Sequence, residues 1–334
     1  MRSNGSVGAA PLLEVRDLQV DFHQGGRMVR AVNGLSYTLQ RGRTLALIGE
    51  SGSGKTVSSR AIMGLLPESA SVRGSIRFDG REVAGLPEPE LRALRGCEIA
   101  MVFQDPARSL NPTMKIGAQI AEAFRLHTDV PQARARERAI ELMELVRLPD
   151  ARRRFSQYPH QLSGGMRQRV MIAIALAADP KLLIADEATS ALDVTTQAQI
   201  MELLGELKDR LGMALILISH DLGLAASFAD EVLVMYAGRA VEWAPTEKLF
   251  AHVRMQYTRA LLEAIPRIEN PSHGRLAAVP GQPPDLALKQ VGCPFTPRCP
   301  AVTQQCRDFT PPFDEQEPEH RWACWHPVGV GESS

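Results

Sequence analysis

The chain has 334 residues, of which 44% are hydrophobic and 23% are charged. This balance is typical of soluble globular proteins and excludes a fibrous or disordered chain. Lys plus Arg equals Asp plus Glu at 38 each, so no net charge attracts nucleic acid, and we expect no nucleic-acid partner. The longest apolar run, residues 170–178, is far shorter than the roughly 20 residues of a membrane-spanning helix, so we do not expect the chain to cross a bilayer.

Both ends of the chain differ in composition from its centre. Residues 1–11 contain Gly and Ser and lack the basic segment and apolar core of a secretory signal, which predicts a flexible tail and a cytoplasmic location. Beyond residue 266, Pro, Gly, Cys and aromatic residues become frequent. We therefore expect an α/β domain over residues 12–265 and a small C-terminal region over residues 266–334.

Short apolar runs that end in polar residues predict buried strands in the main domain. These runs are residues 45–48, which stop at a glycine-rich loop, residues 182–185, which end in Asp186 and Glu187, and residues 214–218, which end in Ser219 and His220. Ligands of open α/β sheets bind at the carboxyl ends of strands. We therefore expect the three ends to meet at one site.

Two further patterns complete the main domain. Residues 117–148 have apolar side chains at helical spacing and lie between the first two strand units, which predicts an inserted helical subdomain. Residues 231–236 and 239–243 flank Ala237 and Gly238, which predicts a hairpin.

The glycine-rich loop after the first strand matches the pattern G-x-x-x-x-G-K-[ST], and a helix follows it. Its residues are Gly49, Glu50, Ser51, Gly52, Ser53, Gly54, Lys55 and Thr56. Such a loop points backbone N–H groups at phosphate oxygens, and the helix N-terminus adds positive charge. We expect Lys55 to contact the β- and γ-phosphates of ATP and Thr56 to coordinate Mg²⁺.

Four polar residues are candidates for the hydrolysis chemistry. Asp186 is the expected second ligand of Mg²⁺, and Glu187 is the expected base that polarises the attacking water. His220 is placed to contact the γ-phosphate, and Gln104 follows an apolar run where its amide reaches metal or water. Each has a structural alternative on its own, as a cap, a solvated pair or a loop residue, and the phosphate loop upstream favours the catalytic interpretation.

A second glycine-containing helix start lies at Leu162, with the sequence Leu-Ser-Gly-Gly-Met-Arg-Gln-Arg, and its Ser163, Gly164, Gly165 and Met166 repeat the features of a phosphate site. This segment resembles the signature sequence of ABC ATPases. The resemblance implies a P-loop NTPase core with a helical subdomain at about residues 106–159 and continuing into the signature helix. It also implies that Ser163 and Gly165 act on ATP held by a second chain.

The same resemblance assigns further residues. Gln104, Asp186, Glu187 and His220 match the Q-loop, the Walker B pair and the switch histidine. The D-loop is matched by Ser190, Ala191, Leu192 and Asp193. An aromatic side chain upstream of the phosphate loop stacks on adenine in this family, and Phe22 is the expected residue, with His23 or a core role for Phe22 as alternatives.

Three segments narrow the resemblance to importers of oligopeptides, dipeptides or nickel. They are Val-Phe-Gln-Asp-Pro at residues 102–106, Ser-Leu-Asn-Pro at residues 109–112 and Tyr-Pro-His-Gln at residues 158–161. Ala188 and Val57 depart from the common pattern, and neither position removes a ligand. The resemblance implies a subunit at the cytoplasmic face of the membrane that works with two transmembrane permease subunits, a second cassette that is a paralogue, and an extracytoplasmic solute-binding protein.

The cargo and the class of protein have alternatives. Oligopeptides or dipeptides are the expected cargo, and nickel chelates or glutathione-like molecules are the alternatives. A soluble ABC ATPase that acts on nucleic acid or ribosomes is the alternative class, which the single cassette and the zero net charge disfavour.

Four of the five cysteines, Cys293, Cys299, Cys306 and Cys324, lie near the C-terminal end. A cytoplasmic location disfavours disulfides between them. Three interpretations stay open: a [4Fe–4S] cluster, a zinc site and plain buried thiols. Zinc sites usually begin with a gap of roughly two to four residues, which is absent here. Iron–sulfur ligation tolerates more varied spacing, and the branch resemblance implies such a cluster for some members.

Overall fold

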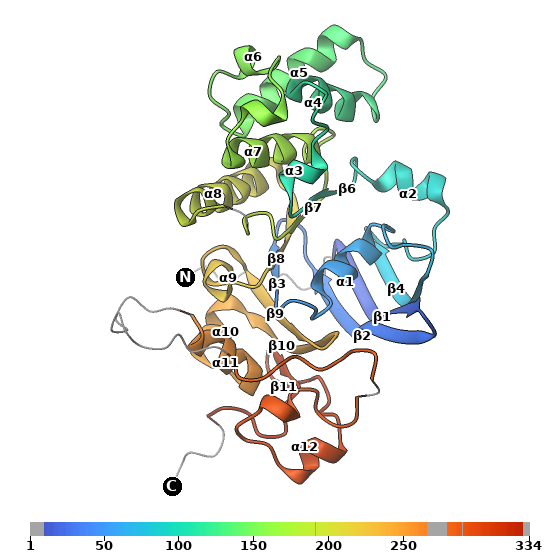
Figure 1. Ribbon diagram of the computed structural model, residues 1–334, viewed down its shortest axis with the longest axis vertical. Helices are drawn as coiled ribbons and strands as arrows, with labels where there is room; N and C mark the ends of the chain where they lie inside the picture. Colours follow the sequence, from blue (N-terminus) through green and yellow to red (C-terminus); the bar gives the residue numbers. More distant parts are fainter. Residues whose placement is uncertain (1–9, 191, 266–278, 289, 330–334) are drawn as a thin grey trace.

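The computed structural model describes residues 10–190, 192–265, 279–288 and 290–329, which contain two β-sheets (Figure 1). The larger sheet has the strand order β11-β12-β10-β9-β3-β8-β7-β6, and the smaller sheet has the order β2-β1-β4-β5. The strands of the larger sheet are β3 (Thr44–Ile48), β6 (Ile99–Val102), β7 (Leu182–Asp186), β8 (Ala214–Ser219), β9 (Glu231–Tyr236), β10 (Arg239–Pro245), β11 (Asp314–Glu317) and β12 (His320–Trp322). Those of the smaller sheet are β1 (Leu13–Gln24), β2 (Arg27–Leu39), β4 (Ala70–Phe78) and β5 (Arg81–Glu82).

The predicted strands at residues 45–48, 182–185 and 214–218 are confirmed as β3, β7 and β8, which are parallel neighbours. Ile48 pairs with Ser219, and Asp186 pairs with Ile218, so the three strands end at one level. The predicted hairpin is confirmed as well, since β9 and β10 pair antiparallel.

After its first residue, Thr44, strand β3 is apolar, and both of its faces are covered. Leu45 and Leu47 belong to the hydrophobic cluster that includes the smaller sheet, whereas Ala46 and Ile48 belong to the cluster on the opposite face. The described helices outside the helical subdomain and the C-terminal region are α1 (Lys55–Ile62), α2 (Glu88–Leu94), α8 (Val194–Leu211), α9 (Leu222–Phe228), α10 (Thr246–Ala251) and α11 (Gln256–Glu263). A strand covered on both faces reads as a continuous apolar run, which is why β3 was recognisable.

A helical subdomain lies at one end of the molecule, opposite the C-terminal region (Figure 1). It contains α3 (Pro106–Ser109), α4 (Ile116–Arg125), α5 (Gln132–Leu145), α6 (Ala151–Arg154), the 3₁₀ turn η1 (Pro159–Gln161) and α7 (Gly164–Ala175). The helices predicted within residues 117–148 are confirmed as α4 and α5. Their buried side chains share one hydrophobic cluster with β6 and β7, so the subdomain packs directly on the core.

The C-terminal region extends the larger sheet. Strand β12 pairs antiparallel with β10. Across this pair, Nε2 of the buried His320 lies 2.9 Å from Oε1 of the buried Glu242. The 3₁₀ turn η2 (Thr296–Arg298) and helix α12 (Gln304–Asp308) precede β11 and β12 in the chain. The predicted boundary at residue 266 and most of the predicted tail, residues 1–9, lie outside the described residues.

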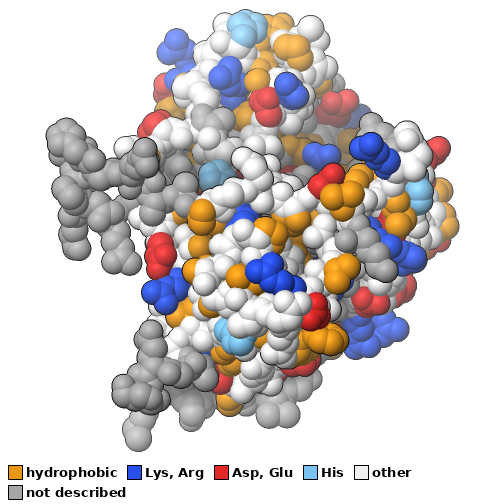
Figure 2. All heavy atoms as spheres, turned by 60° about the horizontal axis from the view of Figure 1, so that its bottom comes forward, with side chains coloured by type: hydrophobic (Ala, Val, Ile, Leu, Met, Phe, Trp, Pro, Cys, Tyr) orange, Lys and Arg blue, Asp and Glu red, His pale blue; other side chains and the backbone are white. Residues whose placement is uncertain are grey.

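Figure 2 shows basic and acidic side chains interspersed on the face seen from the C-terminal region, so no field of one sign covers this face. Among the described helices, none combines the length and the apolar character that a membrane span requires.

Close packing in the helical subdomain leads to a stability prediction. A Cβ added at Gly117 in α4 would lie 2.1 Å from the ring of Phe155. We expect Gly117→Ala to lower the free energy of unfolding by about 1–3 kcal/mol because the ring must shift, as urea titration would measure. The matched control is Gly205→Ala in α8, where an added Cβ meets nothing within 4 Å. It should be neutral or stabilising by up to about 1 kcal/mol, and equal losses at both positions would contradict the packing argument.

Candidate functional site

The phosphate loop joins β3 to α1 and closes around Lys55, whose side chain is buried. The Lys55 Nζ atom donates to the carbonyl oxygens of Gly49 at 2.7 Å and Glu50 at 2.9 Å and to Oγ of Ser53 at 3.4 Å. Burial lowers the pKa of Lys55, and nearby carboxylates oppose this shift. The acceptors of the loop therefore hold the Lys55 ammonium group inside the loop, where a phosphate-binding lysine is expected.

Gly54 shows why the last loop position before Lys55 is a glycine. Its φ of 100° lies in the left-handed region, and an added Cβ would be 2.5 Å from the carbonyl oxygen of Ala31 on β2. A side chain would push the loop away from β2. The predicted residues Ser51 and Gly52 lie at the exposed tip of the loop.

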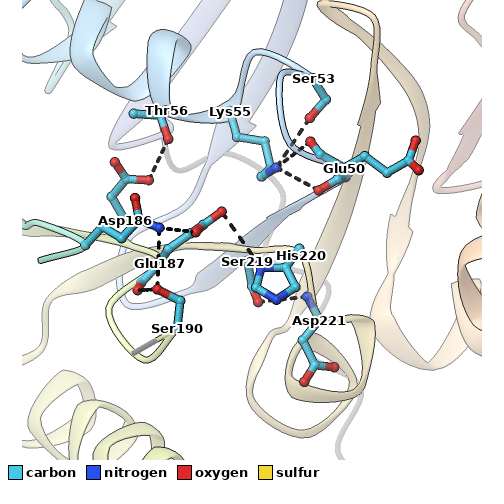
Figure 3. Close-up of polar contacts among 12 residues, drawn as sticks. Glu50, Ser53, Lys55, Thr56, Asp186, Glu187, Ser190, Ser219, His220 and Asp221 are labelled. Atoms are coloured by element: carbon cyan, nitrogen blue, oxygen red, sulfur yellow. Dashed lines mark hydrogen bonds and ion pairs between the residues drawn. The ribbon is translucent and has the colours of Figure 1, made fainter. Parts of the chain in front are cut away.

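A hydroxyl and a carboxylate meet at the start of α1. Thr56 Oγ1 donates to Oδ1 of Asp186 at 2.8 Å, and Asp186 is only 3% exposed (Figure 3). Burial raises the pKa of Asp186, whereas the Thr56 hydrogen bond and the charge of Arg60 lower it. Hydroxyl and carboxylate oxygens are the ligands that Mg²⁺ prefers, so the donor set fits this ion.

Glu187 lies at the centre of the polar cluster beyond β7. Its Oε2 accepts from Gln104 Nε2 at 2.7 Å, and its Oε1 lies 3.9 Å from Nδ1 of His220. Figure 3 shows the Glu187 carboxylate directed toward His220. The φ of Glu187 is 46°, a left-handed value that is rare for a residue with a side chain and is concentrated at functional sites.

The side-chain amide of Gln104 faces the carboxylate of Glu187. Its amide nitrogen faces Glu187 at 2.7 Å and Ser190 Oγ at 3.5 Å, so this end of the amide holds a carboxylate and a hydroxyl. Only the amide oxygen is suited to a metal ion.

The D-loop residues lie beside this cluster. Ser190 Oγ donates to the carbonyl oxygen of Glu187 at 3.1 Å, and Asp193 caps α8 by accepting from the Thr196 N–H at 3.0 Å. Leu192 contributes a partly buried side chain to the core. Ala191 lies outside the described residues.

Asp221, which the sequence analysis missed, fixes the backbone next to the site. Asp221 caps α9 by accepting from the N–H groups of Gly223 and Leu224, and its own N–H donates to Ser219 Oγ at 2.9 Å. These bonds fix the backbone on both sides of His220. An aspartate directly before an apolar helical run is a recognisable N-cap pattern, so this part was open to prediction.

The signature segment begins α7. Ser163 is its N-cap and accepts from the Met166 N–H at 3.3 Å, and Gly165 packs so closely on α8 that an added Cβ would lie 2.7 Å from Thr196. In the described part of the chain, no hydrogen bond or ion pair joins this segment, including Gly164, to the phosphate loop. The signature segment and the phosphate loop are therefore not linked to each other within one chain.

Phe22 lies on β1 between Val29 of β2 and Ala70 of β4. It is half-buried and packs on the cluster of the smaller sheet, while His23 is exposed. Phe22 thus has an apolar contact on one side and accessible surface on the other.

The four C-terminal cysteines are free thiols close enough to influence one another. Burial raises the pKa of Cys293 to about 11, and Cys324, Cys299 and Cys306 add to the shift. Burial also raises the pKa values of Cys299 and Cys324. Among the described residues, no group of three or more Cys, His, Asp or Glu side chains is arranged to hold a metal ion, so the iron–sulfur and zinc predictions are not supported.

Comparison with known proteins agrees with this geometry. The family model of the ABC transporter matches residues 32–190, and the model of the oligopeptide/dipeptide transporter C-terminal region matches residues 241–306. The oligopeptide transport ATP-binding protein OppD of Salmonella typhimurium is 48% identical over 317 residues, covering 95% of this chain and 94% of the relative. OppD of Haemophilus influenzae is 49% identical over 298 residues, covering 89% of this chain and 92% of the relative.

A solved structure shares the core. A dimeric ATP-binding cassette in a post-hydrolysis state, bound to ADP and Pi, aligns with a TM-score of 0.64 and 26% identity over 70% of this chain and 98% of its own. The fold, the phosphate loop and the near full-length relatives lead to one assignment. The chain is an ATPase that belongs to the family of ABC transporter ATP-binding proteins, in the branch with the oligopeptide/dipeptide transporter C-terminal region.

Proposed function

We propose that the chain is the ATP-hydrolysing subunit of an oligopeptide importer, bound peripherally at the cytoplasmic face of the cell membrane. The observation that carries the proposal is the grouping of the phosphate loop, Asp186, Glu187 and His220 at one edge of the larger sheet. Similarity to oligopeptide transport ATP-binding proteins over nearly the whole chain supports the cargo. Nickel chelates and glutathione-like molecules are the alternative cargoes.

The hydrolysis mechanism follows from the positions of four side chains. Lys55 balances negative charge on the β- and γ-phosphates, and Glu187 polarises the water that attacks the γ-phosphate. The Gln104 amide, 2.7 Å from Glu187 Oε2, orients this carboxylate, and His220 Nδ1 lies 3.9 Å from the other carboxylate oxygen. His220 is 63% exposed on the side that ATP would cover.

Thr56, Asp186 and the amide oxygen of Gln104 are the groups that would hold Mg²⁺. The ion supplies positive charge to the phosphate oxygens when it is bound. Asp186 is suited to this role because its burial leaves one hydroxyl, that of Thr56, as its hydrogen-bond partner among the described residues.

ATP would be enclosed between two cassettes. Helix α7 is 12 residues long and begins in the signature, so its first N–H groups and Ser163 form an anion site. Because this site is separate from the phosphate loop of its own chain, we assign it to the ATP of a partner cassette. The partner is a paralogue in this proposal, and a solute-binding protein delivers the cargo to two permease subunits.

An apolar groove at the border between the core and the helical subdomain is the proposed docking site for a permease segment. The groove has a volume of about 270 Å³ and includes Leu65, Phe103 and Leu126, which are 38%, 37% and 75% exposed. Phe103 directly precedes Gln104, which holds Glu187. A segment that moves Phe103 would therefore move a group that orients the catalytic carboxylate.

Replacement of the catalytic carboxylate tests the mechanism. Glu187→Gln should lower the ATP hydrolysis rate of the assembled transporter about a hundredfold or more because the water loses its base, while ATP stays bound in a closed dimer. Steady-state hydrolysis and gel filtration with ATP would measure both effects. The control is Glu206→Gln, which breaks an exposed pair with Arg147 far from the site and should leave the rate within about twofold. A wild-type rate for Glu187→Gln would remove Glu187 from its role.

Stacking of adenine on Phe22 has its own test. Phe22→Ala should raise the KM for ATP several-fold because the base loses its aromatic contact, with a smaller change in kcat. Phe22→Tyr keeps the ring and should preserve the KM. An unchanged KM in the alanine variant would leave Phe22 as a core residue only.

Uptake by the reconstituted transporter tests the cargo and the docking groove together. We expect labelled oligopeptides to be taken up with ATP, and nickel chelates and glutathione not to be. Leu126→Glu places a charge in the apolar groove, so peptide uptake should fall about tenfold or more, while the free chain binds ATP as before. Leu288→Glu is the matched control, since Leu288 is 66% exposed in the C-terminal region.

The outcomes separate the two parts of the proposal. Uptake of nickel chelates or glutathione in preference to peptides would show that oligopeptides are not the cargo. Equal uptake by the Leu126→Glu and Leu288→Glu variants would show that the groove is not the docking site.

A further inference from the structure

An arginine of the C-terminal region reaches the phosphate loop. Arg298 ends the turn η2, and Glu50 is the second residue of the loop, 248 positions earlier in the chain. Arg298 Nη1 lies 2.6 Å from Oε2 of Glu50, and Nη2 lies 2.8 Å from Oε1. The two parallel bonds form a bidentate ion pair, the strongest geometry for this pair of groups.

Arg298 is itself anchored. Its side chain is 1% exposed and donates to the carbonyl oxygens of Pro280 at 2.7 Å and Val279 at 3.1 Å and to Tyr236 Oη at 3.3 Å. These bonds hold the guanidinium in one place. The carboxylate of Glu50 is therefore tied to a fixed point, whereas a surface arginine would follow the loop.

Glu50 transmits this anchoring to the phosphate-binding lysine. Its N–H donates to Tyr257 Oη at 2.9 Å, and its carbonyl oxygen accepts from Lys55 Nζ at 2.9 Å. Figure 3 shows the Glu50 carboxylate pointing away from Lys55. The rings of Tyr257, Tyr236 and Phe295 pack together at centroid distances of 4.5 to 5.4 Å, which makes this support rigid.

The pair also removes an electrostatic obstacle. Glu50 is a carboxylate in the loop that must accept the negative charge of a triphosphate. Without a cation, it would repel the phosphates and compete for Lys55. Arg298 supplies that cation from a side chain that is 1% exposed, and the Glu50 side chain is 26% exposed, so solvent screens this pair less than a fully exposed one.

We propose that Arg298 is a positioning residue for ATP: from the C-terminal region it neutralises Glu50 and holds the phosphate loop in the conformation that binds nucleotide. The inference rests on the proposed function in that the loop is the ATP site. Arg298 acts through Glu50 and touches no reacting atom.

A double-mutant cycle on the full-length chain tests the proposal, with the affinity for a fluorescent ATP analogue and Mg²⁺ as the readout. Arg298→Ala should weaken binding about tenfold because Glu50 is left unpaired. In the Glu50→Gln background, the same replacement should change the affinity less than about twofold, since no carboxylate is left to neutralise. In the assembled transporter, Arg298→Ala should raise the KM for ATP by a larger factor than it lowers the kcat of ATP hydrolysis.

Arg254→Ala is the matched control. Arg254 also ties the C-terminal region to the core, through Glu317 at 2.6 Å and the carbonyl oxygen of Val328, and it does not contact the phosphate loop. Its loss should lower the unfolding temperature and leave ATP affinity within about twofold. Arg298→Lys retains the positive charge without the bidentate geometry, so its ATP affinity should lie between those of the wild type and Arg298→Ala. It replaces the alanine variant in the cycle if that variant folds poorly.

Each result has a defined meaning. Equal losses of affinity on Arg298→Ala replacement in both backgrounds would show a merely structural role and overturn the proposal, as would wild-type affinity in Arg298→Ala. A wild-type chain that binds no ATP would instead refute the proposed function, so the two failures are distinguishable.

Discussion

The parallel register of β3, β7 and β8 is the constraint on which the site depends. Ile48 lies opposite Ser219 and Asp186 opposite Ile218, so the chain leaves all three strands at one level. The phosphate loop, the Asp186–Glu187 pair and His220 then meet because backbone hydrogen bonds align the strands. Side chains on both faces of β3 are packed in hydrophobic clusters, which holds the strand in place.

The charged side chains of the site form hydrogen bonds to neutral groups of the protein. Lys55 is held by loop carbonyl oxygens, Asp186 by the Thr56 hydroxyl, and Glu187 by the Gln104 amide. None of these bonds is an ion pair that a phosphate must break. These bonds hold the three side chains in defined positions, which is a condition for electrostatic preorganisation.

The sequence was sufficient for the parts of the molecule with a local signal. Strands β3, β7 and β8 are short apolar runs, α4 and α5 have helical periodicity, and the phosphate loop is a contiguous motif. Strands β11 and β12 had no such signal: β11 consists of Asp, Glu, Gln and Glu, and it exists because β12 offers it backbone partners. The metal-site interpretation of the cysteines found no support for a related reason, since spacing along the chain does not show how the thiols are arranged in the fold.

The contact between Arg298 and Glu50 spans 248 positions and could not be predicted from either segment. Its consequence follows from thermodynamic linkage. A residue that links the C-terminal region to the phosphate loop couples the packing of that region to nucleotide affinity, and the coupling is reciprocal. Since the carbonyl oxygens of Pro280 and Val279 hold the Arg298 side chain, a change that displaces this segment acts on the loop through Arg298. Bound nucleotide, in turn, favours the packed form of the C-terminal region by the same free energy.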